Sequence, residues 1–213
     1  TVRHGGIAVV QDTQTGDILA LADSDEIEAG SDQAKLTVSR AVSETFEPGS
    51  IGKVFTMSGM IQLGLHQASD KFTVPDHITV NGQTYSDATT HGDEHWTAGI
   101  LEQSSNVGMI IAGEKMSNEQ RYDFIRKFGV GQDNGLGFPG ESDGLLYSSD
   151  QWDLRTQNTV LFGQAYTTNA LQLTNAVAVI ANKGVKKPQR IIKTISDARD
   201  IPKSKSPRVR RRA

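Results

Sequence analysis

Two short apolar runs near the start of the chain lie on either side of a polar turn. The runs are IAVV, residues 7–10, and ILAL, residues 18–21, and the segment between them, DTQTGD, is rich in turn-forming residues. This pattern predicts a β-hairpin. Because both runs are nearly continuous, we expect at least one face of the hairpin to be covered by another element.

The middle of the chain changes to a helical period. Residues 23–45 are polar and are interpreted as a crossing loop, after which apolar side chains recur at helical spacing over residues 50–64. Two further helical patterns, residues 97–103 and 107–116, are separated by the polar break Ser104-Ser105-Asn106. A loop at such a helix junction can turn its side chains into a cleft.

Strands are predicted again near both ends of the chain, with helices between them. The remaining predicted elements are short extended runs around the turn Asn81-Gly82, a helix capped by Ser117 and Gln120, a glycine-rich loop over residues 129–144, a helix over residues 170–182, and a returning strand over residues 190–195. This order indicates an α+β fold in which terminal strands form an antiparallel sheet around an inserted helical lobe. We assign residues 1–195 to this domain and residues 196–213 to a basic tail or a severed loop.

Composition and charge narrow the functional classes. The 213 residues include no cysteine, which excludes disulfides, thiolate metal sites and a cysteine nucleophile. Residues 183–213 carry a net charge of +10 and the rest of the chain −13, so the acidic body is not expected to bind nucleic acid. No apolar run approaches the roughly 20 residues of a membrane-spanning helix, and the chain shows no signal peptide, so any anchor is expected to lie outside it.

The segment SIGK places Ser50 three residues before Lys53 at the start of a predicted helix. Side chains at this spacing lie on one face, with Cβ atoms roughly 5–6 Å apart. Lys53 can take the serine proton only if its amine is neutral, which requires its pKa to fall from about 10.4 to about 7, and burial and a neighbouring cation can supply this shift. Alone, the motif is more typical of an N-cap serine beside an exposed lysine.

The break Ser104-Ser105-Asn106 adds a second group of polar side chains, 54 residues after Ser50. Ser104 can relay a proton between Lys53 and a leaving amine, and Asn106 can hydrogen-bond a substrate carbonyl. Alone, this break is typical of a polar turn. The two motifs in this order, with helical segments between them, favour a catalytic cleft.

With both motifs in view, the sequence resembles the transpeptidase domain of class B penicillin-binding proteins, most closely the division-specific type. That family carries S-x-x-K, an S-D-N-like motif and K-T-G. The resemblance covers about residues 5–195 in the family's order, through the segments AVVQDTQTGDILALA, FEPGSIGKVFT, LEQSSNVG, GFPGE and FGQAYTTNALQLTNAVAVIANKG.

The resemblance implies a penicillin-binding-protein or serine β-lactamase-like fold with Ser50 as nucleophile and Lys53 as general base. Ser104 is then the proton relay, and Asn106 positions the donor peptide. A stem peptide ending in D-Ala-D-Ala would acylate Ser50 and release D-Ala, and a neighbouring stem amine would take the acyl group, cross-linking peptidoglycan during septum synthesis. β-Lactams would acylate the same serine. The resemblance implies no cofactor and no metal.

The same resemblance implies a place in the cell and a set of partners. We expect the domain on the extracytoplasmic face of the bacterial cell membrane, working with divisome and glycosyltransferase proteins. The family's K-T-G is missing, because Lys193-Thr194 is followed by isoleucine and comes too soon after the last helix. We therefore expect either a further C-terminal fragment carrying K-T-G or a chain from which that part has been removed. Without its oxyanion-hole donor the chain alone is an incomplete enzyme, since losing one such donor costs roughly 10²–10³ in rate.

Two other functions remain open from the sequence. A serine β-lactamase uses the same nucleophile but needs a base that activates water for deacylation, and sequence position does not identify one. A non-catalytic β-lactam sensor or division scaffold is the second alternative. The cluster HGDEH, residues 91–95, lacks the H-E-x-x-H spacing of a zinc protease and is interpreted as a polar loop beside the cleft.

Overall fold

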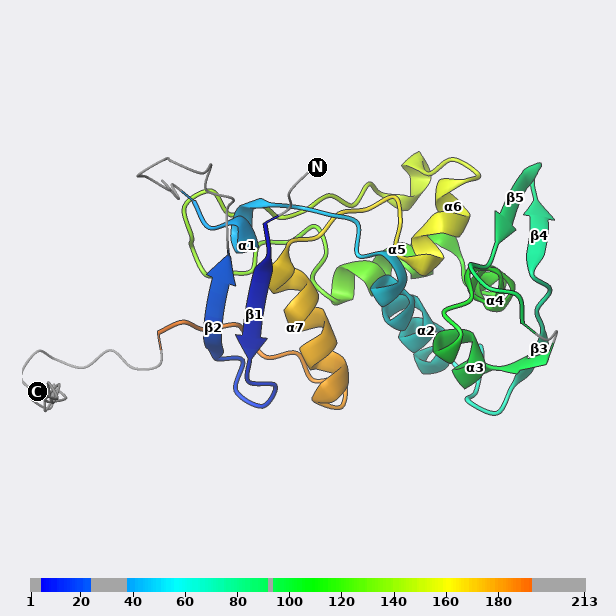
Figure 1. Cartoon of the computed structure of the whole chain (residues 1–213), viewed down its shortest axis with the longest axis horizontal. Coiled ribbons are helices and arrows are strands. Elements are labelled where there is room, and N and C mark those ends of the chain that lie inside the picture. The colour runs from blue at the N-terminus through cyan, green and yellow to red at the C-terminus, as the bar shows by residue number, and fades with distance from the viewer. Residues whose placement is uncertain (1–4, 24–37, 92–93, 193–213) are drawn as a thin grey trace, which may run out of the picture.

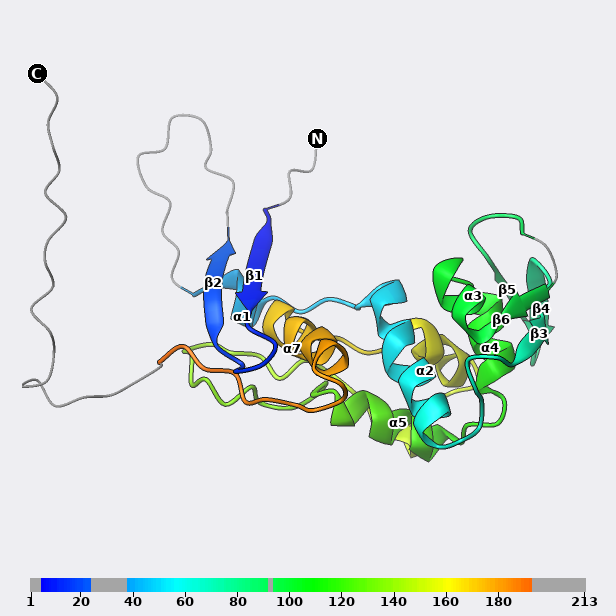
Figure 2. The ribbon, with the colours of Figure 1, turned by 90° about the horizontal axis from the view of Figure 1, so that it is seen from below.

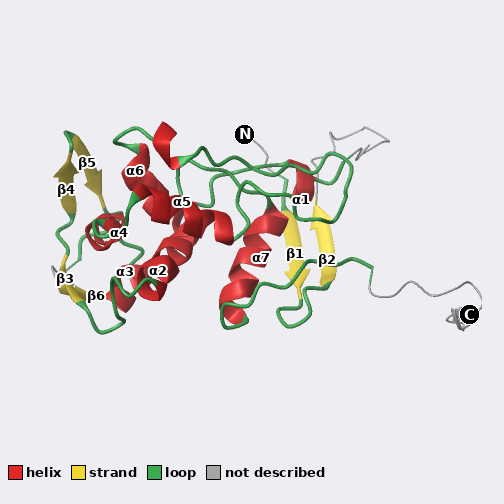
Figure 3. Ribbon diagram, turned by 180° about the vertical axis from the view of Figure 1, so that it is seen from behind, coloured by secondary structure: helices red, strands yellow, loops and turns green. Residues whose placement is uncertain are grey.

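Three two-stranded ribbons and a central group of helices make up residues 5–23, 38–91 and 94–192, the part of the chain that the computed structural model describes. The molecule is elongated, with one ribbon at one end, two at the other and helices between them (Figures 1 and 3). The strands are β1 (Ile7–Gln11), β2 (Ile18–Asp23), β3 (Lys71–Thr73), β4 (His77–Val80), β5 (Gln83–Ser86) and β6 (Glu94–Trp96). The α-helices are α1 (Arg40–Ser43), α2 (Lys53–Gln62), α3 (Thr97–Glu102), α4 (Asn106–Gly113), α5 (Asn118–Lys127), α6 (Thr156–Thr159) and α7 (Ala170–Ala181), and the 3-10 turns are η1 (Gly49–Gly52), η2 (Ser149–Gln151) and η3 (Val160–Phe162).

The predicted first hairpin is confirmed. Strands β1 and β2 pair antiparallel, and α7 packs against β1, as the nearly continuous apolar runs predict. Figure 2 shows α7 between this hairpin and α2. Other apolar side chains of the hairpin are not covered: Val10 is 52% exposed and Leu19 is 64% exposed.

Helix α2 is buried between two hydrophobic cores. Met57 and Met60 belong to a core shared with α4 and the small ribbons, whereas Phe55 belongs to a core shared with α5 and α7. Apolar positions on two sides of one helix require covering from both sides, so α2 lies inside the molecule. Its first turn, which carries Lys53, is thereby drawn into the interior, and Lys53 is only 2% exposed.

The predicted turn at Asn81-Gly82 is also confirmed. Both residues have positive φ angles, 52° and 78°, and join β4 to β5 as a tight antiparallel hairpin. Two-residue hairpin loops favour this left-handed conformation, which Asn and Gly adopt most readily. Strand β5 ends beside the N-terminus of α4 and so reaches the site described below.

The capping box of Ser117 and Gln120 is present at the start of α5. The predicted returning strand is seen only as a parallel bridge between Arg190 and Asp17, and from Lys193 onward it lies outside the described residues. The domain boundary at residue 195, the tail 196–213 and residues 24–37 of the crossing loop also lie outside them. Within the described part, no helix has the length and hydrophobicity needed to cross a bilayer.

Candidate active site

The turn before Ser50 is held in place by a second segment from late in the chain. Phe46 and Thr168 exchange two backbone hydrogen bonds of 3.0 Å, and the amide of Gly49 donates to the carbonyl of Gly163 at 2.9 Å. Gly163 has a φ of +87°, and a Cβ there would lie 1.7 Å from the Gly49 carbonyl oxygen. Only glycine permits this approach. The contact leaves the Ser50 side chain exposed on the turn that leads into α2.

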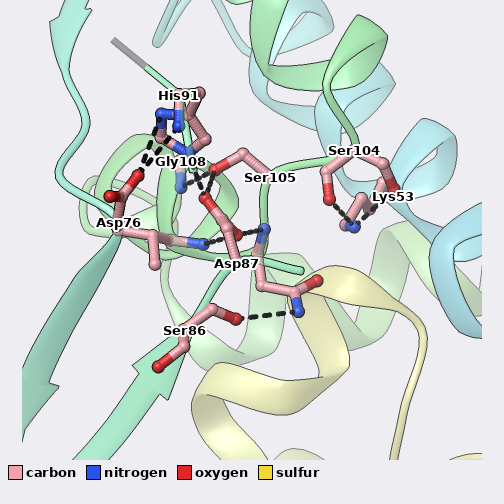
Figure 4. A network of polar contacts seen from close by, with 10 residues as sticks. Lys53, Asp76, Ser86, Asp87, His91, Ser104, Ser105 and Gly108 are labelled. Carbon is pink, nitrogen blue, oxygen red and sulfur yellow. Dashed lines mark hydrogen bonds and ion pairs between the residues drawn. The ribbon is translucent and has the colours of Figure 1, made fainter. Parts of the chain in front are cut away.

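Lys53 joins the two sequence motifs through a single amine. Its Nζ lies 3.0 Å from the Ser50 Oγ, 2.9 Å from the Ser104 Oγ and 2.5 Å from the Ser104 carbonyl oxygen. Figure 4 shows the last two contacts. An ammonium group has three N–H donors, and these three oxygens take all of them. Once one proton is lost, the lone pair of the amine can accept a proton from a serine hydroxyl.

Burial lowers the pKa of Lys53 to about 8, and the negative charge of Asp87 acts in the opposite direction. The predicted effect of burial is therefore present, but the neighbouring charge is a carboxylate rather than a cation. With a pKa of about 8, roughly a tenth of the molecules hold a neutral Lys53 at pH 7.

The turn between α3 and α4 presents Ser104 to Lys53. Ser104 has a φ of +54°, an uncommon left-handed conformation for a residue other than glycine. Its amide donates to the Leu101 carbonyl, and the amide of Ser105 donates to the Ile100 carbonyl. The Ser105 side chain caps α4 by accepting from the Gly108 amide at 2.7 Å.

Asn106 begins α4 on the far side of the same turn. The nitrogen of its side-chain amide, Nδ2, lies 3.5 Å from the carbonyl oxygen of Ser86, at the end of β5. The side chain also lines a largely polar pocket of about 300 Å³, together with Arg155 and Gln164. The structure thus brings Ser50 and Ser104 into hydrogen-bond contact with Lys53 and places Asn106 two residues after Ser104, at the wall of a pocket that the other three residues do not line.

Sequence reasoning missed Asp87, whose carboxylate is 3% exposed and lies directly behind the Ser104–Asn106 turn. Burial acts to raise its pKa, but hydrogen bonds from Ser105, His91 and two backbone amides outweigh burial and hold the pKa below its usual value. His91 contacts this carboxylate at 2.7 Å through Nε2. The sequence offers only a weak signal, an aspartate just after an extended run, because the helix N-terminus that it caps begins 19 residues later.

Comparison with known proteins identifies the family of the chain. Residues 6–213 match the family model for the penicillin-binding protein transpeptidase domain. The chain belongs to this family. A solved peptidoglycan synthetase from Bifidobacterium adolescentis is 72% identical with a TM-score of 0.85, and the match covers 92% of this chain and 36% of that one.

A curated sequence and a solved structure from Mycobacterium tuberculosis are similar to this chain at lower identity. Penicillin-binding protein PbpB of Mycobacterium tuberculosis is 40% identical over 89% of this chain and 29% of its own length. The structure of penicillin-binding protein 3 from the same organism in complex with ampicillin is 39% identical with a TM-score of 0.81, covering 89% of this chain and 43% of that chain. The chain therefore spans less than a third of the length of PbpB, its curated relative.

Proposed function

We propose that this chain carries the acylation centre of a peptidoglycan D,D-transpeptidase of the cell-division type. The observation that supports the proposal is the buried amine of Lys53, within hydrogen-bond distance of both the Ser50 and the Ser104 hydroxyls. A nucleophile with a base in contact, and a second hydroxyl on that base, is the arrangement that covalent acyl transfer requires. The printed name of one relative, peptidoglycan D,D-transpeptidase FtsI of Escherichia coli, supports the same reaction.

In the proposed reaction, the Ser50 Oγ attacks the carbonyl carbon of the penultimate D-Ala of a stem peptide while its proton passes to neutral Lys53. The C–N bond of the tetrahedral intermediate then breaks. Ser104 relays the proton from Lys53 to the departing amine of the terminal D-Ala, and the acyl group stays on Ser50 as an ester. A stem amine from a neighbouring strand attacks this ester, restores the Ser50 hydroxyl and forms the cross-link. Asn106 holds the donor peptide by hydrogen bonds from its side-chain amide.

The K-T-G element and the remaining oxyanion-hole donor are proposed to come from protein outside residues 1–213, since the chain spans 29% of its curated relative. An apolar groove of about 430 Å³ between β1 and α7 supports this placement, since it offers a surface on which further strands can pack. We place the assembled domain on the extracytoplasmic side of the cell membrane, with divisome and glycosyltransferase proteins as partners and β-lactams as inhibitors.

A labelled penicillin tests the proposal. The intact protein is incubated with the label, the adduct is mapped by peptide mass spectrometry, and D-Ala release is measured with a pentapeptide substrate. We expect an adduct on Ser50 that lasts for hours, together with D-Ala release. An adduct that turns over in seconds would indicate a β-lactamase instead, and a stable adduct without D-Ala release a non-catalytic sensor or scaffold. Absence of label on Ser50 would overturn the proposal altogether.

A further inference from the structure

Behind the Ser104–Asn106 turn, four donors converge on one buried carboxylate, that of Asp87 (Figure 4). Oδ1 accepts from the amides of Asn106 at 2.5 Å and Val107 at 3.1 Å. Oδ2 accepts from the Ser105 hydroxyl at 2.5 Å and contacts the Nε2 of His91 at 2.7 Å. The first two are donors at the N-terminus of α4, which a helix cannot satisfy internally.

We propose that Asp87 is a positioning residue that fixes the Ser104–Asn106 turn against Lys53, acting from behind the turn without touching the reacting atoms. The proposal rests on the proposed acyl transfer for its consequence in catalysis. We call the four contacts of Asp87 with His91, Ser105, Asn106 and Val107 the clamp. Its existence can be tested without any reaction.

The conformation of Ser104 shows why a clamp matters. Its φ of +54° is unfavourable for a serine, and such residues persist only where their surroundings hold them. Backbone bonds from Ser104 and Ser105 to α3 hold the turn on one side, and Asp87 holds the following two amides and the Ser105 hydroxyl on the other. If the Asp87 side is released, Ser104 can relax, and its hydroxyl and carbonyl then leave the Lys53 amine.

Asp87 also acts on Lys53 through its charge. Among the described residues it is the charged group that raises the pKa of Lys53 against the effect of burial. The titratable groups on the other side of Asp87 are His91, in contact with it, and Asp76, whose Oδ1 lies 3.8 Å from the His91 Nδ1. Removing only the Asp87 charge must therefore lower the pKa of Lys53, whereas a purely structural aspartate would leave it unchanged.

The chain offers a matched control in Asp70. It too contacts a histidine four residues away, His66, and accepts from a backbone amide, that of Gln67 at 3.0 Å. Its side chain is 39% exposed and contacts neither Lys53 nor the Ser104–Asn106 turn. Asp70→Asn thus removes a comparable histidine-bound carboxylate elsewhere in the same lobe.

Amide hydrogen exchange on the intact protein tests the clamp. In Asp87→Ala we expect exchange at Asn106 and Val107 to accelerate by roughly tenfold or more, since these amides lose their acceptor, while α5 keeps its wild-type exchange. Asp87→Asn keeps one oxygen that can accept from the two amides, so we expect their exchange rates in this variant to lie between those of wild type and Asp87→Ala. Unchanged exchange at both amides in Asp87→Ala would overturn the clamp. If Asp87→Ala does not fold, Asp87→Asn alone decides the test: faster exchange at these two amides supports the clamp, and unchanged exchange overturns it.

The pH profile of penicillin acylation tests the effect on Lys53. We expect Asp87→Asn to shift the midpoint of the profile to lower pH by roughly half a unit. Asp87→Ala is expected to lower the plateau rate by about 10- to 100-fold, comparable to the loss of a positioned proton-transfer group. Asp70→Asn should leave both the midpoint and the plateau at wild-type values. A midpoint in Asp87→Asn equal to that of wild type would overturn the electrostatic role.

The two experiments separate failure of this inference from failure of the proposed function. If wild type forms no adduct on Ser50, the proposed function fails, while hydrogen exchange still decides whether Asp87 holds the turn. If wild type is acylated and both Asp87 variants match it in exchange, midpoint and plateau, only the inference about Asp87 fails.

Discussion

Two lysines with lowered pKa values lie in different regions of the molecule, and only one has the surroundings of a base. Desolvation lowers the pKa of Lys186, as it does that of Lys53. Lys186 lines a pocket of about 410 Å³ that also contains a serine, Ser58. The Ser58 hydroxyl, however, donates to the Val54 carbonyl at 2.5 Å, and no hydrogen bond joins it to Lys186 among the described residues.

The difference shows that desolvation alone does not make a lysine a catalytic base. Lys53 is 2% exposed, and its amine lies within hydrogen-bond distance of two serine hydroxyls. A neutral Lys53 can therefore accept a proton from either serine. A lowered pKa is a common result of apolar surroundings, whereas contact with a nucleophile requires two segments of chain to be fixed against each other. The predictions below test this contrast, beginning with the largest expected effect.

The first prediction concerns Ser50 and Lys53 themselves. Ser50→Ala should abolish covalent penicillin labelling of the intact protein, and Lys53→Met should reduce the acylation rate by about 10³-fold or more, because the proton of Ser50 then has no base. Lys53→Met should keep the melting temperature near that of wild type, since a buried charge is replaced by an apolar chain of similar length. Labelling of Lys53→Met at the wild-type rate would show that the contrast between the two lysines has no catalytic meaning.

The second prediction concerns the other hydroxyl on Lys53. Ser104→Ala should lower the rate of acylation by about 10²-fold, because the relay between Lys53 and the leaving amine is lost. Stopped-flow measurement with a chromogenic cephalosporin gives this rate. Ser58→Ala is the matched control on the same lobe and should acylate normally. Equal rates in Ser104→Ala and wild type would remove Ser104 from the mechanism.

The third prediction concerns the pH dependence of the acylation rate, which reports the pKa of Lys53. Since only neutral Lys53 can accept a proton and its pKa is about 8, the rate of acylation should rise about tenfold per pH unit below 8 and level off above it. The sign follows from burial, which favours the neutral amine. A rate that does not change between pH 6 and pH 9 would contradict the assignment of Lys53 as base.

The smallest effect is expected at the second lysine. Lys186→Met should change the rate of acylation less than twofold and leave its pH midpoint unchanged, since the amine contacts neither motif. The measurement is the same pH profile, run beside wild type. A midpoint that moves with Lys186 would mean that the wrong lysine has been assigned to the titration.

Sequence patterns predicted the secondary-structure elements correctly where residues close together in the chain control the geometry. The Asn81-Gly82 hairpin and the Ser117–Gln120 capping box are both present as expected, because each depends only on neighbouring residues. The same holds for the hairpin of β1 and β2. Asp87 was not predicted, because three of its partners, the consecutive residues 105–107, follow it by 18 to 20 positions and no spacing along the chain reveals that they meet it.

The sequence by itself determined which chemical groups are present and which lie one helical turn apart. It placed Ser50 and Lys53 on one face of a helix start, and it put Ser104 and Asn106 at a break between helices. Only the tertiary structure decided that Lys53 loses contact with water and meets Ser104, and that a carboxylate from the end of β5 holds that turn from behind. The physical reason is that pKa values and proton transfer depend on burial and on distances of about 3 Å, which packing between distant segments sets.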